Sequence, residues 1–318
     1  MPKVAVLFTN HYRTFPLISN TIKEFYGPNV DFYASTWDHD HGNLTYNETV
    51  DLLKGNSSIA YNEWYNTSVA YMELNLQKVK NELKDFEIKD FIINSADEYD
   101  LWASQIQGFT YSTWWEKFLR FGTLYTKVKG WELIKSTGIH YDIIFYHRFD
   151  TLNFIKKEVL SNKHAFEKIF RKDWNNHLGV SKLSIAKGYV WVDDKFFYTS
   201  SIGSAKLFDD TINTLNMIIS NPLFKDNAQS HFCNHKLLGT LIQAAKFRRL
   251  YNTPFDNTTI YKSTVLDGCN LNDFDSCQKH HELIKTLAGR GSEPLKEPIH
   301  NEWAEEFFKV QIKKYRGA

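Results

Sequence analysis

Residues 4–8, VAVLF, open the chain with an unbroken apolar run that ends in polar residues. A short run of this kind is typical of a strand buried on both faces of a parallel sheet. Residues 15–25 then place apolar side chains every three or four positions, which predicts a helix, and residues 27–29, Gly-Pro-Asn, end it. Residues 30–35 form a second strand. The order strand, helix, strand predicts an α/β fold built on an open, mostly parallel sheet flanked by helices.

The rest of the chain continues this alternation. Strands are predicted at 86–93, at 141–146 and within 190–198, and helices at 71–83, 113–134, 212–219 and 236–245. Residues 38–68 form a polar excursion with one short helix at 50–54, residues 252–298 are loop-rich, and a last amphipathic helix covers 301–314. We therefore predict a main domain at 1–250 and a C-terminal extension at 251–318 with a lid-like loop and a terminal helix.

Composition places the chain among ordinary soluble proteins. Hydrophobic residues make up 42% and charged residues 24%, and 38 Lys and Arg against 37 Asp and Glu leave a net charge of +1. This balance of charges gives no strong overall electrostatic attraction to nucleic acid or anionic lipid. No stretch approaches the ~18 apolar residues of a membrane span, and the N-terminus lacks the pattern of a signal peptide. With three scattered cysteines, these features predict free thiols and a cytoplasmic location, the host cytoplasm if the protein is viral.

Several common catalytic motifs are missing from the sequence. No G-x-G-x-x-G follows the first predicted strand, where residues 9–13 read TNHYR. The chain has no P-loop G-K-[ST], no H-E-x-x-H, no C-x-x-C and no G-x-S-x-G. These absences disfavour a dinucleotide-binding turn, a P-loop nucleotidase, a zinc protease and the nucleophile elbow of an α/β-hydrolase.

The segment YDIIFYHRFD at residues 141–150 carries the chemistry that the sequence suggests. Its apolar run predicts a buried strand, which delivers Arg148 and Asp150 at its carboxyl end. In open α/β sheets, ligands sit in the crevice outside those ends. A carboxylate there can hold a divalent cation that bridges diphosphate oxygens, and a guanidinium can bind phosphate in a bidentate fork. The alternative is an Arg–Asp ion pair that closes the strand and binds nothing.

Four short segments occur in order: VAVLFTNHYRTF at 4–15, DFYASTWD at 31–38, YDIIFYHRFD at 141–150 and WVDDKFFYTS at 191–200. Through them, across residues 3–245, the chain resembles the glycosyltransferases of nucleotide-diphospho-sugar (GT-A) fold in the WavE-like polysaccharide-synthesis group and their viral relatives. The resemblance implies a hexosyltransferase-like enzyme that moves a sugar from a UDP- or GDP-linked donor to a hydroxyl of a glycan or polysaccharide precursor. The chain departs from the family pattern in its first turn, in the single Asp of its metal motif, and before its late helix: the family has Gly where this chain has Asn10-His11, and often Glu where it has Asn234-His235.

The resemblance also implies roles for individual residues. Asp150 would hold Mn²⁺ or Mg²⁺ on the diphosphate, with Arg148 beside it. Asp194, or less favourably Asp193, would face the acceptor, and in an inverting reaction it would be the general base; the other interpretation of this pair is a turn between strands. Nucleotide contacts are implied for residues at the ends of the first two strands, namely Thr9, Arg13, Ser35, Thr36 and Trp37.

Departure of a nucleoside diphosphate needs positive charge placed in advance around its phosphates. Arg290, between two glycines in the loop-rich region, is a candidate to close over the diphosphate. His300, before the last helix, is a further candidate contact to the metal and diphosphate. The alternative, which the composition of this region favours, is that both residues lie in ordinary surface loops.

Three other function classes stay open. A viral glycosyltransferase acting on hydroxymethylated DNA bases would need a basic groove, for which residues 246–249 (KFRR) and 313–316 (KKYR) are local clusters, so nucleic acid is an acceptor that is not favoured. A nucleotidyltransferase of similar fold would release pyrophosphate instead. A non-catalytic carbohydrate-binding protein would use the 17 Tyr and 9 Trp as a stacking surface.

Overall fold

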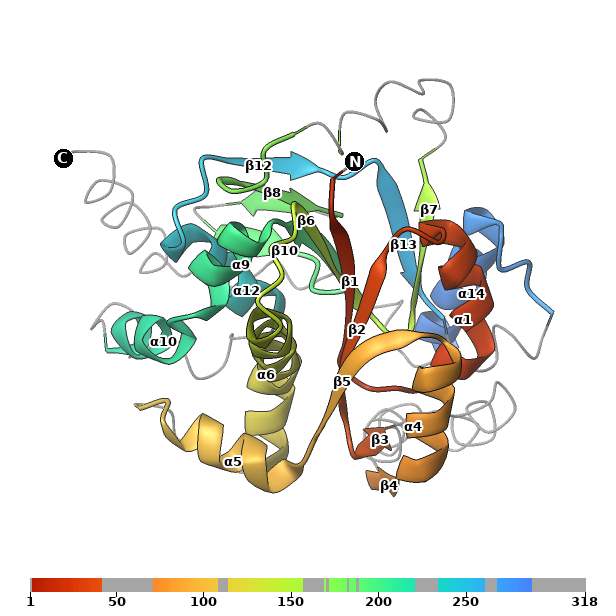
Figure 1. Ribbon diagram of the computed structural model, residues 1–318, viewed down its shortest axis with the longest axis horizontal. Coiled ribbons are helices and arrows are strands. Elements are labelled where there is room, and N and C mark those ends of the chain that lie inside the picture. Colours follow the sequence, from red (N-terminus) through yellow and green to blue (C-terminus); the bar gives the residue numbers. More distant parts are fainter. Residues whose placement is uncertain are drawn as a thin grey trace.

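The centre of the molecule is a seven-stranded sheet with helices on both faces (Figure 1). The computed structural model describes residues 2–41, 71–107, 114–156, 169, 172–181, 183–186, 189–220, 234–260 and 268–287. In spatial order the strands are β12 (Arg249–Asn252), β8 (His177–Val180), β11 (Phe196–Thr199), β6 (Ile143–Arg148), β1 (Val4–Thr9), β2 (Asp31–Trp37) and β5 (Ile88–Asn94). Neighbouring strands are parallel except where β11 pairs with β6 and β8. The chain therefore has the predicted α/β fold with a mostly parallel sheet.

Two helical layers cover the sheet (Figure 1). One layer contains α5 (Ala96–Ser104), α6 (Trp114–Ser136), α9 (Ser201–Phe208), α10 (Thr211–Ile219) and α12 (Asn234–Ala244). The other contains α1 (Phe15–Tyr26), α4 (Leu76–Asp85) and α14 (Phe274–Leu287). Three two-stranded sheets complete the described fold: β3 (His39–His41) with β4 (Tyr71–Glu73), β7 (Thr151–Ile155) with β13 (Phe255–Thr259), and β9 (Leu183–Ala186) with β10 (Tyr189–Val192). None of the helices in these ranges combines the length and apolar character needed to cross a bilayer.

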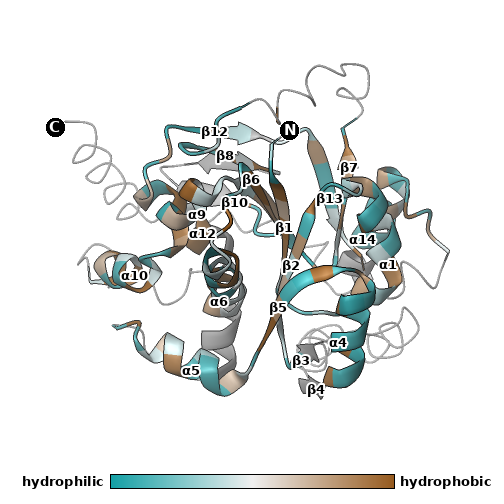
Figure 2. Ribbon diagram, in the orientation of Figure 1, coloured by the Kyte–Doolittle hydropathy of each residue, from teal (hydrophilic) through white to brown (hydrophobic). Residues whose placement is uncertain are grey.

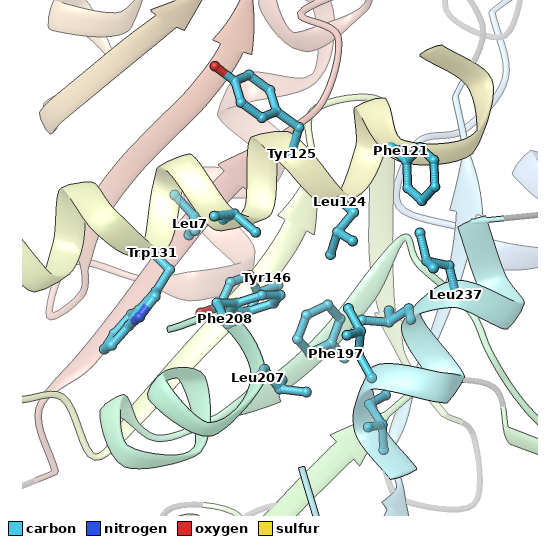
Figure 3. Packing of buried hydrophobic residues seen from close by; sticks show 14 of the residues in the cluster. Leu7, Phe121, Leu124, Tyr125, Trp131, Tyr146, Phe197, Leu207, Phe208 and Leu237 are labelled. Carbon is cyan, nitrogen blue, oxygen red and sulfur yellow. The ribbon is translucent and has the colours of Figure 1, made fainter. Parts of the chain in front are cut away.

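Strand β1 explains why the sheet needs cover on both faces. Its alternate residues enter two different cores, with Ala5 and Leu7 against the α6 layer and Val6 and Phe8 against the α1 layer. All four side chains are fully buried, and each large one contributes about 1.5–3 kcal/mol relative to exposure. Figure 3 shows Leu7 within the first of these cores. Helix α4 is mostly hydrophilic, whereas β6 is mostly hydrophobic (Figure 2).

Helix α6 lies unusually close to β1 because of one glycine. A Cβ added at Gly130 would lie 2.6 Å from a methyl carbon of Leu7. The helix precedes β6, which runs parallel to β1, so α6 runs in the opposite direction to these strands. Its residues before Gly130 therefore lie towards the carboxyl edge of the sheet. This approach brings Lys127, one turn earlier, next to the site described below.

The predicted helix at 71–83 is wrong at its beginning. Residues 71–73 form β4, which pairs with β3, and α4 starts only at Leu76. The Asn75 side chain accepts a hydrogen bond from the Lys78 backbone N at 3.0 Å, which caps the helix there. The apolar residues around 71–74 fit both the helix period of 3.6 residues and the strand period of two. Pairing with the distant strand β3 makes this segment a strand.

The region 252–298 contains more regular structure than predicted. Strand β13 and helix α14 lie within it, and β13 pairs with β7. Helix α5 was also not predicted, although Ser95 and Glu98 form a capping box at its start. The predicted boundary at 250/251 falls inside β12 of the central sheet, and the division into two domains stays a prediction. The predicted helices at 50–54 and 301–314 lie outside the described residues.

Candidate functional site

The candidate site lies at the carboxyl ends of β1 and β6. These strands are neighbours in the sheet, but the chain leaves β1 towards β2 on the other side, so the strand order reverses between β1 and β6. Open α/β sheets bind ligands at such a switch point, because the loops there separate and leave a crevice. Thr9 and Arg148 are register partners at this edge. The topology thus confirms that Arg148 lies at the carboxyl edge where the sequence predicts it.

The reversed strand β11 brings a third segment to the same edge. Because β11 is antiparallel to β6, its first residue, Phe196, pairs with His147 near the end of β6. The residues just before β11 therefore lie beside Arg148, whose backbone N donates to the Lys195 carbonyl at 3.0 Å. Asp193 and Asp194 are both buried here. The structure thus brings the two predicted acidic residues next to the predicted Arg–Asp motif.

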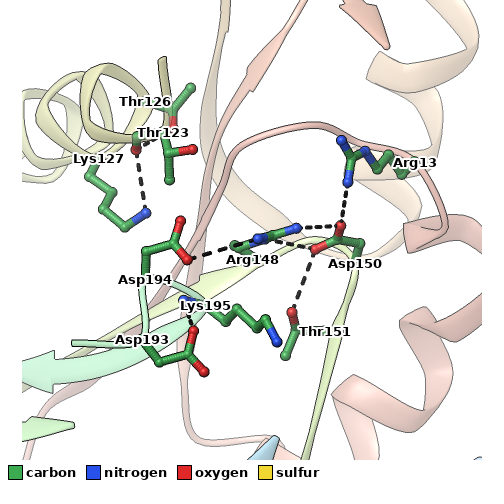
Figure 4. Close-up of polar contacts among 10 residues, drawn as sticks. All are labelled: Arg13, Thr123, Thr126, Lys127, Arg148, Asp150, Thr151, Asp193, Asp194 and Lys195. Atoms are coloured by element: carbon green, nitrogen blue, oxygen red, sulfur yellow. Dashed lines mark hydrogen bonds and ion pairs between the residues drawn. The ribbon is translucent and has the colours of Figure 1, made fainter. Parts of the chain in front are cut away.

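Asp150 is held by two arginines (Figure 4). Arg148 makes a bidentate pair with it, from Nε to Oδ1 at 2.9 Å and from Nη2 to Oδ2 at 2.7 Å. Arg13 donates from Nη1 to Oδ2 at 2.9 Å. Burial alone would raise the pKa of Asp150, but the charges and hydrogen bonds of the two guanidiniums outweigh it and hold the pKa well below its usual range. Asp150 is therefore an ionised carboxylate that orients both arginines.

The turn after β1 presents Arg13 in an unusual backbone conformation. Asn10 has φ 81° and Arg13 has φ 36°, both in the left-handed region. Asn tolerates this region better than most residues, and Arg does not favour it. The Thr36 hydroxyl donates to the Asn10 carbonyl at 2.9 Å, which ties the turn to the end of β2. Strained backbone of this kind persists where surrounding contacts fix it, and it is concentrated at functional sites.

Two lysines that no sequence motif indicates complete the charge distribution. Lys127 comes from α6 and is 1% exposed, with its Nζ donating to the Thr123 carbonyl at 3.3 Å. Burial lowers its pKa to about 8, partly offset by the negative charge of Asp194. Burial also lowers the pKa of Lys195. The only sequence signal for Lys127 is a lysine on the otherwise apolar face of a long helix.

We call Arg13, Lys127, Arg148 and Lys195 the basic cluster. These four cations surround Asp150, Asp193 and Asp194 and leave one net positive charge (Figure 4). Arg148 lies between two carboxylates, since its Nη1 is also 3.9 Å from Asp194 Oδ1. Burial would lower the pKa of Arg148, but the charges of Asp150 and Asp194 raise it above its ordinary value. The arrangement suits an anion that replaces solvent around preorganised cations.

The same carboxylates do not fit a divalent cation as they lie. Both oxygens of Asp150 accept hydrogen bonds from guanidinium groups, and Asp193 Oδ1 accepts from the Lys195 backbone N at 3.2 Å. Within the described ranges, no group of three or more His, Cys, Asp or Glu is arranged to hold a metal ion. Mn²⁺ or Mg²⁺ at Asp150 stays a prediction that would require the arginines to move. The charge available to a phosphate here is that of the basic cluster.

The predicted nucleotide contacts at the end of β2 are buried in the protein interior. Ser35 accepts from Asn94 Nδ2 at 3.0 Å, and the Trp37 ring stacks on Tyr125 with centroids 5.5 Å apart. Ser35, Thr36 and Trp37 are fully buried, as is Thr9 at the end of β1. Their described contacts support the edge of the sheet, and the predicted contact with a base or ribose stays a prediction. Of the predicted nucleotide contacts, Arg13 is the most accessible, with 26% of its side chain exposed.

Arg290 and His300 lie outside the described residues, so their predicted roles at the diphosphate stay predictions. Cys277 is a buried thiol that forms no disulfide. Cys233 lies outside the described residues, so the prediction of three free thiols stays a prediction. No protein-family model matches this sequence, and no curated protein gives a significant match. The functional interpretation therefore rests on the geometry of the switch-point site and on the sequence motifs that form it.

Proposed function

We propose that this chain is a glycosyltransferase that moves a sugar from a nucleoside-diphosphate donor to a hydroxyl acceptor. The observation that carries the proposal is the basic cluster beside Asp193 and Asp194 at the switch point between β1 and β6. Cations at this place favour a ligand with phosphate groups. Carboxylates next to them favour a reaction in which a hydroxyl loses a proton. The motif resemblance across residues 3–245 supports the same class.

The basic cluster would stabilise the departing diphosphate. In the transfer, the bond from the anomeric carbon to the diphosphate oxygen breaks, and its electron pair goes to that oxygen. Charges that are already fixed around the oxygen lower the barrier without reorganising. Arg148 is fixed in this sense by Asp150 and Asp194, whereas the partly exposed Arg13 and Lys195 are the cations that a ligand reaches first.

A carboxylate of the pair would accept the acceptor proton. The acceptor oxygen forms the new bond to the anomeric carbon and gives its proton to Asp194, or less favourably to Asp193. Asp194 is the closer candidate because it lies within 3.9 Å of the arginine that we assign to the diphosphate. This assignment applies to an inverting transfer.

Calorimetric binding of UDP, GDP and their sugar conjugates tests the proposal, with Mn²⁺ and separately with EDTA. We expect a nucleoside diphosphate to bind and Lys195→Ala to weaken its binding by about tenfold, the loss of one charge-assisted contact. Lys89→Ala is the matched control, because Lys89 pairs with Asp31 at 2.9 Å at the opposite edge of the sheet. The control should bind like the natural chain.

Three results would contradict the proposal. The first is the absence of binding to every nucleoside diphosphate and conjugate tested. The second is binding of a glycan that no nucleoside diphosphate strengthens or weakens, which would indicate a carbohydrate-binding protein. The third is an equal loss of binding in the Lys195 and Lys89 variants, which would place the ligand elsewhere.

A further inference from the structure

A second concave site lies on the α1 side of the molecule. It is a cavity of about 590 Å³ between α1, β7, β13 and the segment that leads into α14. Figure 1 shows these elements grouped on one side of the sheet. No residue of the basic cluster lines it. Its volume lies within the range of small-molecule sites, roughly 300–1,000 Å³.

The wall of this cavity is acidic. Glu24 of α1, Asp256 of β13, and Asp273 and Asp275 at the start of α14 contribute four carboxylates. The described lining residues include no lysine, arginine or histidine. Asp273 also caps α14, because its Oδ2 accepts from the Ser276 backbone N at 3.1 Å. The four carboxylates come from three different elements, and the acidic wall that they form favours a cationic occupant.

An uncharged acceptor in the same wall points to a ligand as well. Asn153 of β7 is 7% exposed and lines the cavity. Its Nδ2 donates to the Tyr26 hydroxyl at 3.2 Å, so the carboxamide connects β7 to α1, and residues of both elements line the cavity. Its Oδ1 has no hydrogen-bond partner among the residues that the structure describes. A buried acceptor without a partner is unfavourable unless a donor is supplied.

Most of the remaining lining is apolar and aromatic. Phe25, Phe154 and Phe274 contribute rings, and Ile155 and Leu271 contribute aliphatic surface. Rings accept ammonium groups through cation–π contacts and also cover methylene chains. We infer that the cavity binds an aliphatic polyamine, a chain of ammonium groups separated by methylenes. The ammonium groups face the carboxylates and the Asn153 Oδ1, and the methylenes lie against the rings.

Calorimetry with spermidine on the full chain tests this inference independently of any nucleotide. We expect a Kd below about 1 mM that weakens as NaCl rises. The double variant Glu24→Gln/Asp256→Asn should weaken binding by about tenfold, because it removes two partly exposed ion pairs. The matched control is Glu132→Gln/Asp142→Asn, which removes the same charge from exposed positions outside the cavity.

A second variant keeps the test decisive if the carboxylate changes disturb folding. Thr21 lies on the cavity wall, and Thr21→Arg would supply an internal cation that competes with spermidine. It should abolish binding while thermal stability is kept or raised. Equal spermidine affinity in the natural chain, both double variants and Thr21→Arg would overturn the inference. Displacement of spermidine by equimolar Mg²⁺, or tighter binding of an uncharged methyl glycoside, would also overturn it.

Discussion

Replacing Asp150 by Asn removes one buried charge and leaves its size unchanged. Arg148 then keeps its buried guanidinium, 14% exposed, without the bidentate partner. Removing one member of a buried ion pair typically costs about 3–5 kcal/mol, because the remaining charge stays desolvated. Arg13 loses a partner too, but its exposed part regains water, so its share is below about 1 kcal/mol. We expect a loss of unfolding free energy on the order of 4 kcal/mol.

Urea unfolding followed by circular dichroism measures this loss. With a total stability of about 5–15 kcal/mol, the variant should still fold. For an m-value of about 3 kcal/mol/M, the midpoint should fall by about 1–2 M. Glu132→Gln is the control, because it removes an exposed charge that pairs with Lys129 and should change stability by less than about 1 kcal/mol.

A double replacement separates the ion pair from the fold. Arg148→Met/Asp150→Leu removes both charges and should recover most of the loss, since apolar residues of similar volume often replace a buried pair without penalty. If Asp150→Asn lost less than about 1 kcal/mol, or if the double variant were as unstable as the single one, the reasoning about this pair would be refuted.

Lowering the pH should remove the stabilisation that the Arg148–Asp150 pair provides. The folded-state pKa of Asp150 lies below the ordinary value of 3.8. Its stabilising contribution is therefore complete above pH 3.8 and is lost as the pH falls below that value towards the folded-state pKa. The stability difference between the natural chain and Asp150→Asn should shrink between pH 5 and pH 2.

Two further predictions concern packing and burial. Lys127→Met should raise the unfolding free energy by about 3 kcal/mol at pH 7, because the folded state lowers the lysine pKa from 10.5 to about 8. Between pH 8 and pH 10.5 the lysine keeps its proton in the unfolded chain but loses it in the folded one, so the natural chain gains stability as the pH rises. Urea unfolding over this pH range should show that the stability advantage of the variant disappears. Gly179→Ala should cost about 1–3 kcal/mol, because the added Cβ would lie 2.2 Å from the ring of Tyr198 on the neighbouring strand. Calorimetry should show a lower Tm, and an unchanged Tm would contradict the close contact.

The core of the fold could be predicted because it depends on local patterns. Strands β1, β2 and β6 are short apolar runs, and each was predicted to within two residues at either end. The hairpin of β3 and β4 was missed because its strands are separated by 29 residues, and no local period shows such a pairing. The start of α5 could have been recognised from Ser95 and Glu98, which form a capping box in the printed sequence.

In the candidate site, too, the residues that follow a local sequence pattern could be predicted, and those placed by tertiary contacts could not. Arg148 and Asp150 were predicted at the edge because they follow directly after an apolar run. Lys195 was missed because its position depends on β11 being antiparallel to β6, and strand direction is not encoded in a four-residue segment. Lys127 was missed because the close approach of α6 depends on Gly130 meeting a leucine more than a hundred residues earlier.

The reversal of β11 has a consequence for how this site can vary. Arg148 is the last residue of β6, which ends at this edge, whereas the two acids directly precede β11, which begins there. A one-residue insertion between Asp194 and Phe196 would slide the acids along the rim while the hydrogen-bond ladder of the sheet stayed intact. The carboxylates that would accept the proton can thus change position without moving the phosphate-binding cations. A change of acceptor substrate therefore need not alter donor binding.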